Sequence, residues 1–465
     1  MERPTEGAGA ARPAPLYPSS PRVSNAHLFR AGERHMLLSV ASGRVYELDP
    51  ILARTIDLTM NFGDGERVGQ FMEAAGVFET PAEVGPPATV PVRALSLAVA
   101  QKCNLGCTYC YAQQGSFGGA ESGMSLDVAL AAVDSLLGGA APGEKVSLAY
   151  LGGEPLAGRP VLRAATEYAA RKAAEAGVEV AFSLTTNATL LDADDADFFE
   201  RHRFAVTVSI DGVGEAHDRL RPFKSGRGSY ERVVERARLL FARSPRRSQI
   251  TARVTVTPGN LRLRETLDEL LRLGFDAVQF SPMLSSPSGA GEMGAAALDA
   301  MLSQLMECGG EFERRLRDNS FYPFLNVINT LRRIHERGRD EYPCGAGGSY
   351  LGVSSGGGLY ACHRFVDDEA GAMGDLAGGV DAARRRLWLT ERNVHAQEPC
   401  RTCWARHLCG GGCHHEAIRR GRPACDYIRG WLHYCLSLYA TLSKEVPSLL
   451  ARALDPGRGA RPAQP

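Results

Sequence analysis

The feature that most constrains the fold is a regular alternation of short apolar segments with amphipathic ones, beginning near residue 94. The apolar segments have the length of buried strands, and the segments between them have helical periodicity. The expected strands are 94–100, 146–151, 178–185, 204–210, 250–257 and 277–281, and the expected helices are 126–138, 160–176, 193–202, 230–243, 263–273 and 295–317. Six such units predict a parallel sheet with functional groups at the carboxyl ends of its strands. Both a partial barrel and a doubly wound open sheet fit this pattern.

Three cysteines, Cys103, Cys107 and Cys110, follow the first of these strands on one short loop. Three thiolates hold three irons of a cubane cluster and leave the fourth iron without a protein ligand. Zinc usually takes a fourth ligand or a water and often a histidine, and the sequence has no histidine nearby. The spacing therefore predicts an iron–sulfur cluster with one open iron. A zinc site or a group of structural thiols is the alternative.

A second group of cysteines lies toward the carboxyl end of the chain. Its pattern is C-x12-G-x4-C, then C-x2-C-x5-C-x3-C, then one further cysteine. The members are Cys344, Cys362, Cys400, Cys403, Cys409, Cys413 and Cys425, and Cys435 follows within a helical pattern. Seven cysteines at this spacing predict metal binding, and a pair of zinc knuckles is the simpler alternative. Cys308 stands alone and is expected to be a buried thiol.

Positive and negative charges balance in this chain, with 53 Lys plus Arg and 53 Asp plus Glu. No overall field therefore favours nucleic acid or an anionic membrane as a partner. No apolar run reaches 18 residues, and residues 1–24 lack the apolar core of a signal peptide. The expected location is the cytoplasm, where twelve cysteines favour metal binding or catalysis over disulfides.

Residues 25–80 form a small unit of their own. Strand-like segments 36–40 and 44–48 flank a turn and predict a hairpin. Asp49 followed by Pro50 predicts the start of a helix ending near residue 60, and a second helix is expected over 66–75. The unit contains five arginines, no lysine and eight acidic residues, which is the wrong balance for binding phosphates.

The Cys-x3-Cys-x2-Cys loop resembles that of radical S-adenosylmethionine (SAM) enzymes, and the resemblance extends from residue 89 to about residue 440. It selects the open barrel, so the expected fold class is α/β with a partial (β/α)6 barrel. In that family the open iron chelates the amino and carboxylate groups of SAM. One electron then splits the sulfonium, and the resulting 5′-deoxyadenosyl radical removes hydrogen from an unactivated carbon. The implied cofactors are [4Fe–4S] clusters and S-adenosylmethionine.

The same resemblance implies cofactor contacts for residues near the strand ends. Gly152, Gly153 and Glu154 match the family's GGEP segment, which holds the methionine amino group. Ser209 and Asp211 match the residues that meet the ribose. Arg221 matches the arginine that takes the cofactor carboxylate, although without the family it reads as a solvated surface charge. Tyr109 matches the aromatic residue whose backbone meets the adenine.

Two positions depart from a simple reading of the strands. Thr186-Asn187-Ala188 stands where the family has Thr-Asn-Gly, which leaves the role of Asn187 open. Arg253 is unusual for a fully buried strand position, and one alternative is that it faces the barrel mouth.

The second cysteine group resembles the SPASM extension of radical enzymes that modify peptides and proteins, which holds two auxiliary iron–sulfur clusters. By this resemblance one cluster takes Cys400, Cys403, Cys409 and Cys425, and the other takes Cys344, Cys362 and Cys413. The second set is one ligand short. Either Cys435 completes it or its fourth iron is open, and an open iron binds a substrate thiolate.

The resemblance also implies a domain order and partners. The hairpin unit resembles a winged-helix-like recognition domain, to whose sheet edge a segment of the substrate would add a strand, and a plain structural cap is the alternative. The expected order is a disordered tail (1–24), this recognition domain (25–80), a linker (81–90), the partial barrel (91–320), a bridging segment (321–343), the SPASM domain (344–442) and a carboxyl-terminal helix end and tail (443–465). The expected partners are a ribosomal peptide or small protein substrate and an electron donor such as a flavodoxin or ferredoxin, with no nucleic acid and no membrane.

The segment around Cys403 and the glycines before Cys413 resemble maturases that join a cysteine sulfur to a peptide carbon. These include enzymes that cross-link the small subunit of quinohemoprotein amine dehydrogenase. Thioether formation is therefore the leading expectation. One alternative is oxidation of Cys or Ser to formylglycine, as in anaerobic sulfatase maturases, which requires an acid–base residue that the sequence does not reveal. The other is a zinc-stabilised peptide-binding scaffold without catalysis.

Overall fold

A curved sheet with six neighbouring parallel strands organises the computed structural model, which describes residues 25–62, 90–244 and 246–455. The six strands, in their order across the sheet, are β4 (Ala94–Gln101), β6 (Lys145–Gly152), β7 (Glu179–Thr186), β8 (Ala205–Ser209), β9 (Gln249–Val256) and β10 (Ala277–Pro282). All five pairings between them are parallel. The expected α/β class and each of the six expected strands are confirmed.

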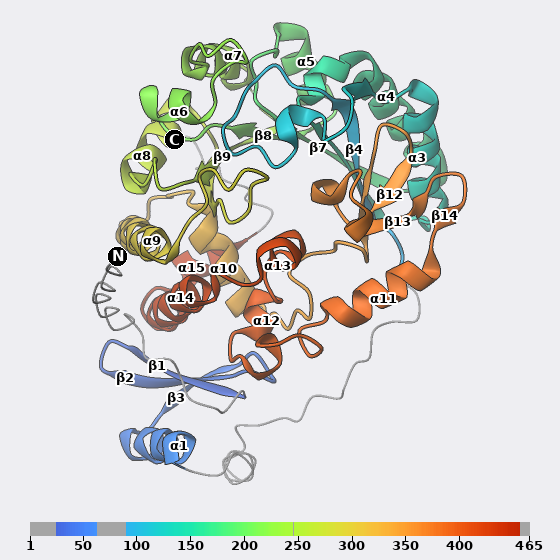
Figure 1. Ribbon diagram of the computed structural model, residues 1–465. Coiled ribbons are helices and arrows are strands. Elements are labelled where there is room, and N and C mark those ends of the chain that lie inside the picture. Colours follow the sequence, from blue (N-terminus) through green and yellow to red (C-terminus); the bar gives the residue numbers. More distant parts are fainter. Residues whose placement is uncertain (1–24, 63–89, 245, 456–465) are drawn as a thin grey trace, which may run out of the picture.

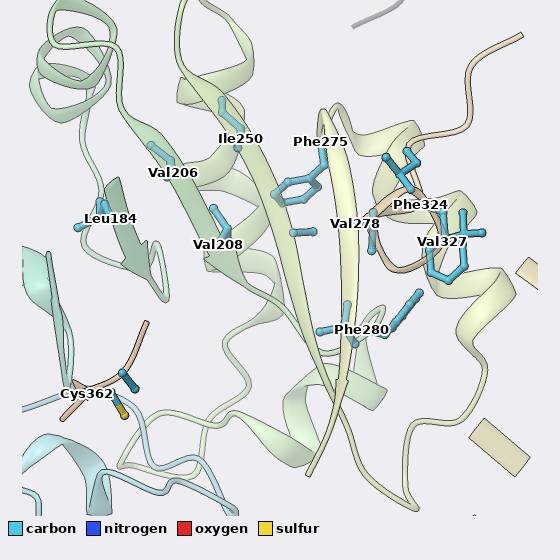
Figure 2. Packing of buried hydrophobic residues seen from close by; sticks show 14 of the residues in the cluster. Leu184, Val206, Val208, Ile250, Phe275, Val278, Phe280, Phe324, Val327 and Cys362 are labelled. Carbon is cyan, nitrogen blue, oxygen red and sulfur yellow. The ribbon is translucent and has the colours of Figure 1, made fainter. Parts of the chain in front are cut away.

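Helices cover the outer face of this sheet (Figure 1). They are α3 (Leu126–Gly138), α4 (Arg159–Ala176), α5 (Ala193–Arg201), α6 (Glu215–Leu220), α7 (Tyr230–Phe241), α8 (Leu263–Leu273) and α9 (Ala295–Arg317). Side chains such as Val206, Val208 and Ile250 fill the space between strands and helices (Figure 2). The sequence predicted six of these helices, and it missed the six-residue α6.

Strand β9 has one buried face and one half-buried face, whereas β4 is buried on both faces from Leu95 to Gln101. In β9 the even-numbered residues from Ile250 to Val256 are buried, and the odd-numbered residues between them are half-buried. Successive side chains of a strand point to opposite faces, so the odd-numbered set lines the inside of the curved sheet. This inner face is where the sequence placed the functional groups.

The cysteine-rich region continues the central sheet. Its strand β11 (Tyr350–Val353) pairs in parallel with β4, and the antiparallel strands β12 (Gly358–Tyr360), β13 (Ala372–Asp375) and β14 (Gly379–Val380) follow. A short strand β5 (Ser122–Gly123) also pairs with β4. The helices of this half are α10 (Leu325–His335), α11 (Ala382–Arg392), α12 (Arg406–Cys409), α13 (His414–Arg420), α14 (Cys425–Glu445) and α15 (Pro447–Leu454). The sequence did not predict that this region joins the barrel sheet.

The amino-terminal unit is a three-stranded antiparallel sheet followed by a helix. The strands β1 (Ala26–Ala31), β2 (Arg34–Ser39) and β3 (Val45–Leu48) pair in chain order, and α1 spans Pro50–Phe62. The Ile51 amide donates a hydrogen bond to Asp49 Oδ1 at 2.8 Å, as a capping aspartate does. The predicted hairpin is confirmed and β1 was missed. The expected tails, the second helix over 66–75 and nearly all of the linker lie outside the described residues.

Side-chain contacts dock this sheet on the cysteine-rich region. The imidazole of His27 stacks on Trp404 with ring centroids 3.6 Å apart and hydrogen bonds His433 at 3.0 Å. Arg34 donates to the backbone carbonyl of Ala440 at 2.9 Å. Among the described helices, none combines the length and apolar character needed to cross a bilayer.

Candidate active site and cysteine clusters

The three-cysteine loop begins where β4 ends, and backbone hydrogen bonds hold it against the segment after α6. The Gly106 amide donates to the Pro222 carbonyl at 2.8 Å, and the Thr108 amide donates to the Leu220 carbonyl at 3.1 Å. Cys103, Cys107 and Cys110 are each partly buried. The loop therefore presents three thiols on one fixed turn at the carboxyl edge of the sheet.

Burial raises the pKa values of two of these thiols, Cys103 and Cys107. Burial raises the pKa of the Cys107 thiol to about 12, and the nearby cation of Arg221 acts in the opposite direction. Burial also raises the pKa of Cys103, with negative charge on Glu154 adding to the effect. Without a metal Cys103 and Cys107 stay protonated at neutral pH, whereas iron binds the thiolates and displaces their protons. The loop therefore fits thiolate ligands whose negative charge is stabilised by the bound iron.

Single-metal coordination fits the cysteines less well. Around one zinc ion, four sulfurs at 2.3 Å would lie within about 4 Å of one another. Throughout the described ranges, no group of three or more His, Cys, Asp or Glu side chains converges in this way. In a cubane each cysteine binds a different iron, so the ligand sulfurs lie farther apart than around a single zinc ion.

Arg221, Tyr109 and Asp211 meet beside the loop. Arg221 Nη1 donates to the Tyr109 hydroxyl at 2.7 Å and lies 3.6 Å from an Asp211 carboxylate oxygen, and the Tyr109 hydroxyl donates to Asp211. The pKa of Asp211 is raised by burial and lowered in turn by Arg221. Only 11% of the Arg221 side chain is exposed, so the solvated-surface alternative is wrong. Its buried Nε has no hydrogen-bond partner in the described part of the chain, which leaves a donor available to a ligand such as a carboxylate.

Glu154 is fully buried, and three protein donors fix its carboxylate. Oε1 accepts hydrogen bonds from the Leu156 amide at 3.0 Å and the Thr186 hydroxyl at 2.7 Å, and Oε2 accepts one from the Asn187 amide at 2.7 Å. Burial raises the pKa of Glu154, and these hydrogen bonds oppose the rise. The structure thus places Glu154 beside the loop as a carboxylate anchored to the end of β7.

The two glycines before Glu154 let β6 reach the cysteine loop. A Cβ on Gly153 would lie 2.3 Å from the Lys102 carbonyl oxygen, and one on Gly152 would lie 2.3 Å from that of Ala100. No side chain fits at such distances, so both positions require glycine for close backbone approach. Ser209, at the end of β8, is half-buried on the inner face of the sheet.

The structure gives contacts for Asn187, whose role the sequence left open. Its Nδ2 lies 3.7 Å from Cys103 Sγ and donates to Asn104 Oδ1 at 3.0 Å. Ala188 takes the left-handed conformation at φ 60°, which explains why glycine is usual there and shows that alanine preserves the turn. The position of Asn187 after a predicted strand was the only sequence signal for this contact.

The second group of cysteines divides into two sets in space. Cys344, Cys362 and Cys413 influence one another electrostatically, as do Cys400, Cys403, Cys409 and Cys425. A partly open cavity lies at the four-cysteine set, and Cys413 borders it as well. The family resemblance implied the same division, and ligation of two clusters by these sets stays a prediction.

Cys435 lies apart from both sets. It is fully buried on α14, ten residues beyond Cys425, and a helix rises about 15 Å over that length. Burial holds its pKa well above the usual thiol range. This placement speaks against Cys435 as a ligand and leaves the set of Cys344, Cys362 and Cys413 with three cysteines.

Arg364 connects the two cysteine regions, which the sequence did not predict. It donates to Glu416 at 2.7 Å and lies 3.6 Å from Cys413 Sγ, and its guanidinium carbon is 5.2 Å from the ring centroid of Tyr111, beside Cys110. The neighbouring His363 is kept neutral because burial lowers its pKa to about 3.

Comparison with known proteins agrees with this fold and site. Residues 97–260 match the model of the radical SAM superfamily. The chain is an iron–sulfur enzyme of the oxidoreductase type that carries this radical SAM domain. Its cofactors are S-adenosylmethionine and a [4Fe–4S] cluster, and the cysteine-rich carboxyl-terminal region suits auxiliary clusters.

The relatives found include anaerobic sulfatase-maturating enzymes. The serine-type enzyme of Klebsiella aerogenes is 26% identical over 365 residues, which cover 76% of this chain and 87% of the relative. The cysteine-type enzyme of Clostridium perfringens (strain 13 / Type A) is 26% identical over 354 residues, covering 70% and 89%. The solved structure of anSMEcpe with bound AdoMet aligns with a TM-score of 0.65 and 22% identity, covering 80% of this chain and all of that one. That structural likeness supports the fold.

Proposed function

We propose that this enzyme oxidises a cysteine or serine side chain of a peptide or protein substrate to formylglycine. The observation that carries the proposal is that serine-type and cysteine-type sulfatase-maturating enzymes align with 70–76% of the chain, over 87–89% of their own length. Support also comes from a structural neighbour solved with AdoMet and the Cp18Cys peptide. When bound, the cluster and SAM supply a 5′-deoxyadenosyl radical that removes one hydrogen atom from the substrate.

The residues of this chain have distinct parts in the proposed reaction. The loop thiols hold the cluster, and Arg221 offers its unpartnered Nε to the cofactor carboxylate. Loss of a Cβ hydrogen atom to the 5′-deoxyadenosyl radical, of one further electron to an auxiliary iron–sulfur cluster and of the thiol proton to water would turn cysteine into a thioaldehyde. Water would then convert the thioaldehyde to the aldehyde and hydrogen sulfide. Serine loses the corresponding two hydrogens and gives the aldehyde directly. A donor such as a flavodoxin or ferredoxin would provide the initiating electron.

A specific observation keeps thioether formation as a second candidate. Cys435 lies apart from Cys344, Cys362 and Cys413, so this auxiliary set provides three thiolates for four irons. Cys344, Cys362 and Cys413 would hold this cluster, and its open iron would bind a substrate thiol as the thiolate and could accept the electron released when a carbon radical forms a bond to the sulfur. In this reading the amino-terminal unit would hold a neighbouring segment of the same substrate.

The test uses anaerobically reconstituted protein with SAM, a strong reductant and synthetic peptides that carry Cys or Ser in sulfatase-type sequences. Formylglycine is expected as an aldehyde that reacts with a hydrazide probe, with deoxyadenosine released in step. A peptide that loses two hydrogens and forms no aldehyde supports the thioether instead. Cys107→Ala is the control, since it removes a cluster ligand and is expected to abolish both products. Deoxyadenosine without any change in Cys or Ser peptides would reject both proposals.

A further inference from the structure

Arg253 is a charged residue on the inner face of the barrel sheet. Its neighbours on this face, at the ends of β8, β9 and β10, are uncharged: Thr207, Ser209, Thr251, Thr255, Gln279 and Ser281. A guanidinium inside a folded sheet is costly unless a hydrogen-bonded or charged partner compensates for lost hydration. Arg253 therefore needs a partner that accounts for its position.

The protein itself gives Arg253 little compensation. Its Nη1 donates to Gln279 Oε1 at 2.8 Å, and Gln279 is a neutral acceptor on the adjacent strand. Within the described ranges Arg253 forms no ion pair with a carboxylate, although a guanidinium has five N–H donors arranged for one. Burial lowers the pKa of Arg253, and repulsion from Arg364 adds to the effect. Both observations describe a cation that has no carboxylate from the described residues in direct contact.

The nearest carboxylate is already engaged. Glu416 accepts a hydrogen bond from Arg364 at 2.7 Å, and each of these side chains is 16% exposed. Glu416 attracts Arg253 only from a distance. The Glu416 carboxylate thus pairs with Arg364 and is not in contact with Arg253.

The position of Arg253 relates it to the expected chemistry. Arg253 stands in register with Ser209 on the neighbouring strand, and strands lie about 4.8 Å apart. Two residues further along β9, the Thr255 amide donates to Asp211 at 2.8 Å. Arg253 is therefore one strand away from residues expected at the cofactor ribose, and it faces toward Arg364 and the auxiliary cysteines.

We propose that Arg253, with Gln279 beside it, binds a carboxylate of the peptide substrate and so sets which residue reaches the radical. This inference rests on the proposed function, because it requires a peptide inside the barrel. The proposed function assigns Arg221, with its unpartnered Nε, to the carboxylate of the cofactor. Arg253 is therefore available to bind a carboxylate of the substrate. The carboxylate belongs either to an Asp or Glu side chain or to a free carboxyl terminus.

The experiment measures anaerobic binding of fluorescent cysteine-containing peptides to the reconstituted holoenzyme with SAM. Peptides are made in pairs, with Glu or Gln at each position near the cysteine and with a free or amidated carboxyl terminus. A charged hydrogen bond contributes about 1.5–3 kcal/mol, so the wild type is expected to prefer one carboxylate peptide by about 10–100-fold. Arg253→Gln is expected to remove that preference, and Arg253→Lys, which keeps the charge, to retain part of it. Arg262→Gln, at an exposed site with the same loss of charge, is the matched control.

Each outcome decides the inference. Loss of the preference in Arg253→Gln alone supports it, and the pair affected identifies a side-chain or terminal carboxylate. Equal binding of all pairs by the wild type overturns it, as does a preference that survives in Arg253→Gln. Weaker SAM binding by Arg253→Gln in the absence of peptide also overturns it, because Arg253 would then serve the cofactor. If the preference is present and no peptide is oxidised or cross-linked, Arg253 keeps its role and the proposed function fails.

Discussion

Replacing Cys435 tests the division of the cysteines directly. Cys435 is fully buried, so Cys435→Ala removes a group about the size of one methylene from a packed helix interface. Such deletions cost about 0.5–1.5 kcal/mol in unfolding free energy. The variant is expected to be slightly less stable and to keep all of its iron. Three clusters correspond to about twelve irons per chain.

The assay is anaerobic reconstitution followed by iron and sulfide analysis, with urea unfolding on the same samples. Cys308→Ala is the matched control, because Cys308 is equally buried and stands on α9 away from the predicted sets. Cys413→Ala is expected to lose about four irons. If Cys435→Ala loses about four irons and Cys308→Ala loses none, then Cys435 is a ligand and the argument from its burial is wrong.

Three other changes probe the site and the docking of the amino-terminal unit. Asn187→Leu removes the amide donor 3.7 Å from Cys103 Sγ. Loss of a hydrogen bond to a ligand sulfur is expected to lower the reduction potential of the cluster, measured by an EPR redox titration. An unchanged potential would contradict that contact. Gly153→Ala forces a Cβ to within 2.3 Å of the Lys102 carbonyl oxygen. We expect the free energy of unfolding to fall by about 1–3 kcal/mol or more and the cluster to assemble poorly. Full iron loading of this variant would refute the expectation. Burial lowers the pKa of His27 from 6.5 to about 3, so the unfolded state binds more protons between these values and stability falls as pH drops through that window. At pH 5.5 this effect lowers the free energy of unfolding by about 1.4 kcal/mol relative to pH 7.5. Urea unfolding at the two pH values is expected to show that His27→Phe removes this difference.

The barrel was predictable because local patterns determine it. The sequence of β9 alternates between core and inner-face residues, and the strand spans 249–256 where 250–257 was expected. The strand β11 was missed because it has four residues and its partner β4 lies about 250 residues earlier. Its pairing is a tertiary contact that no local periodicity reveals.

The candidate site was predictable where residue type and spacing carry chemistry. Cys103, Cys107 and Cys110 identified the loop, and the contacts of Arg221 agree with a place beside it. The role of Asn187 was left open and Arg364 was missed, because their importance comes from sulfurs 84 and 49 residues away in the chain. A single sequence gives no sign of such pairs, and only the folded backbone brings them together.

The pairing of β11 with β4 has a practical consequence for dissecting this enzyme. A chain cut before Tyr350 would lose the strand that covers the backbone of β4 from Ala94 to Leu97. Bare strand edges recruit other chains, so such a fragment is expected to aggregate even though its six parallel strands are intact. Studies of the isolated barrel would therefore need a replacement edge strand, and insolubility of the fragment would say nothing about the metal sites that were removed.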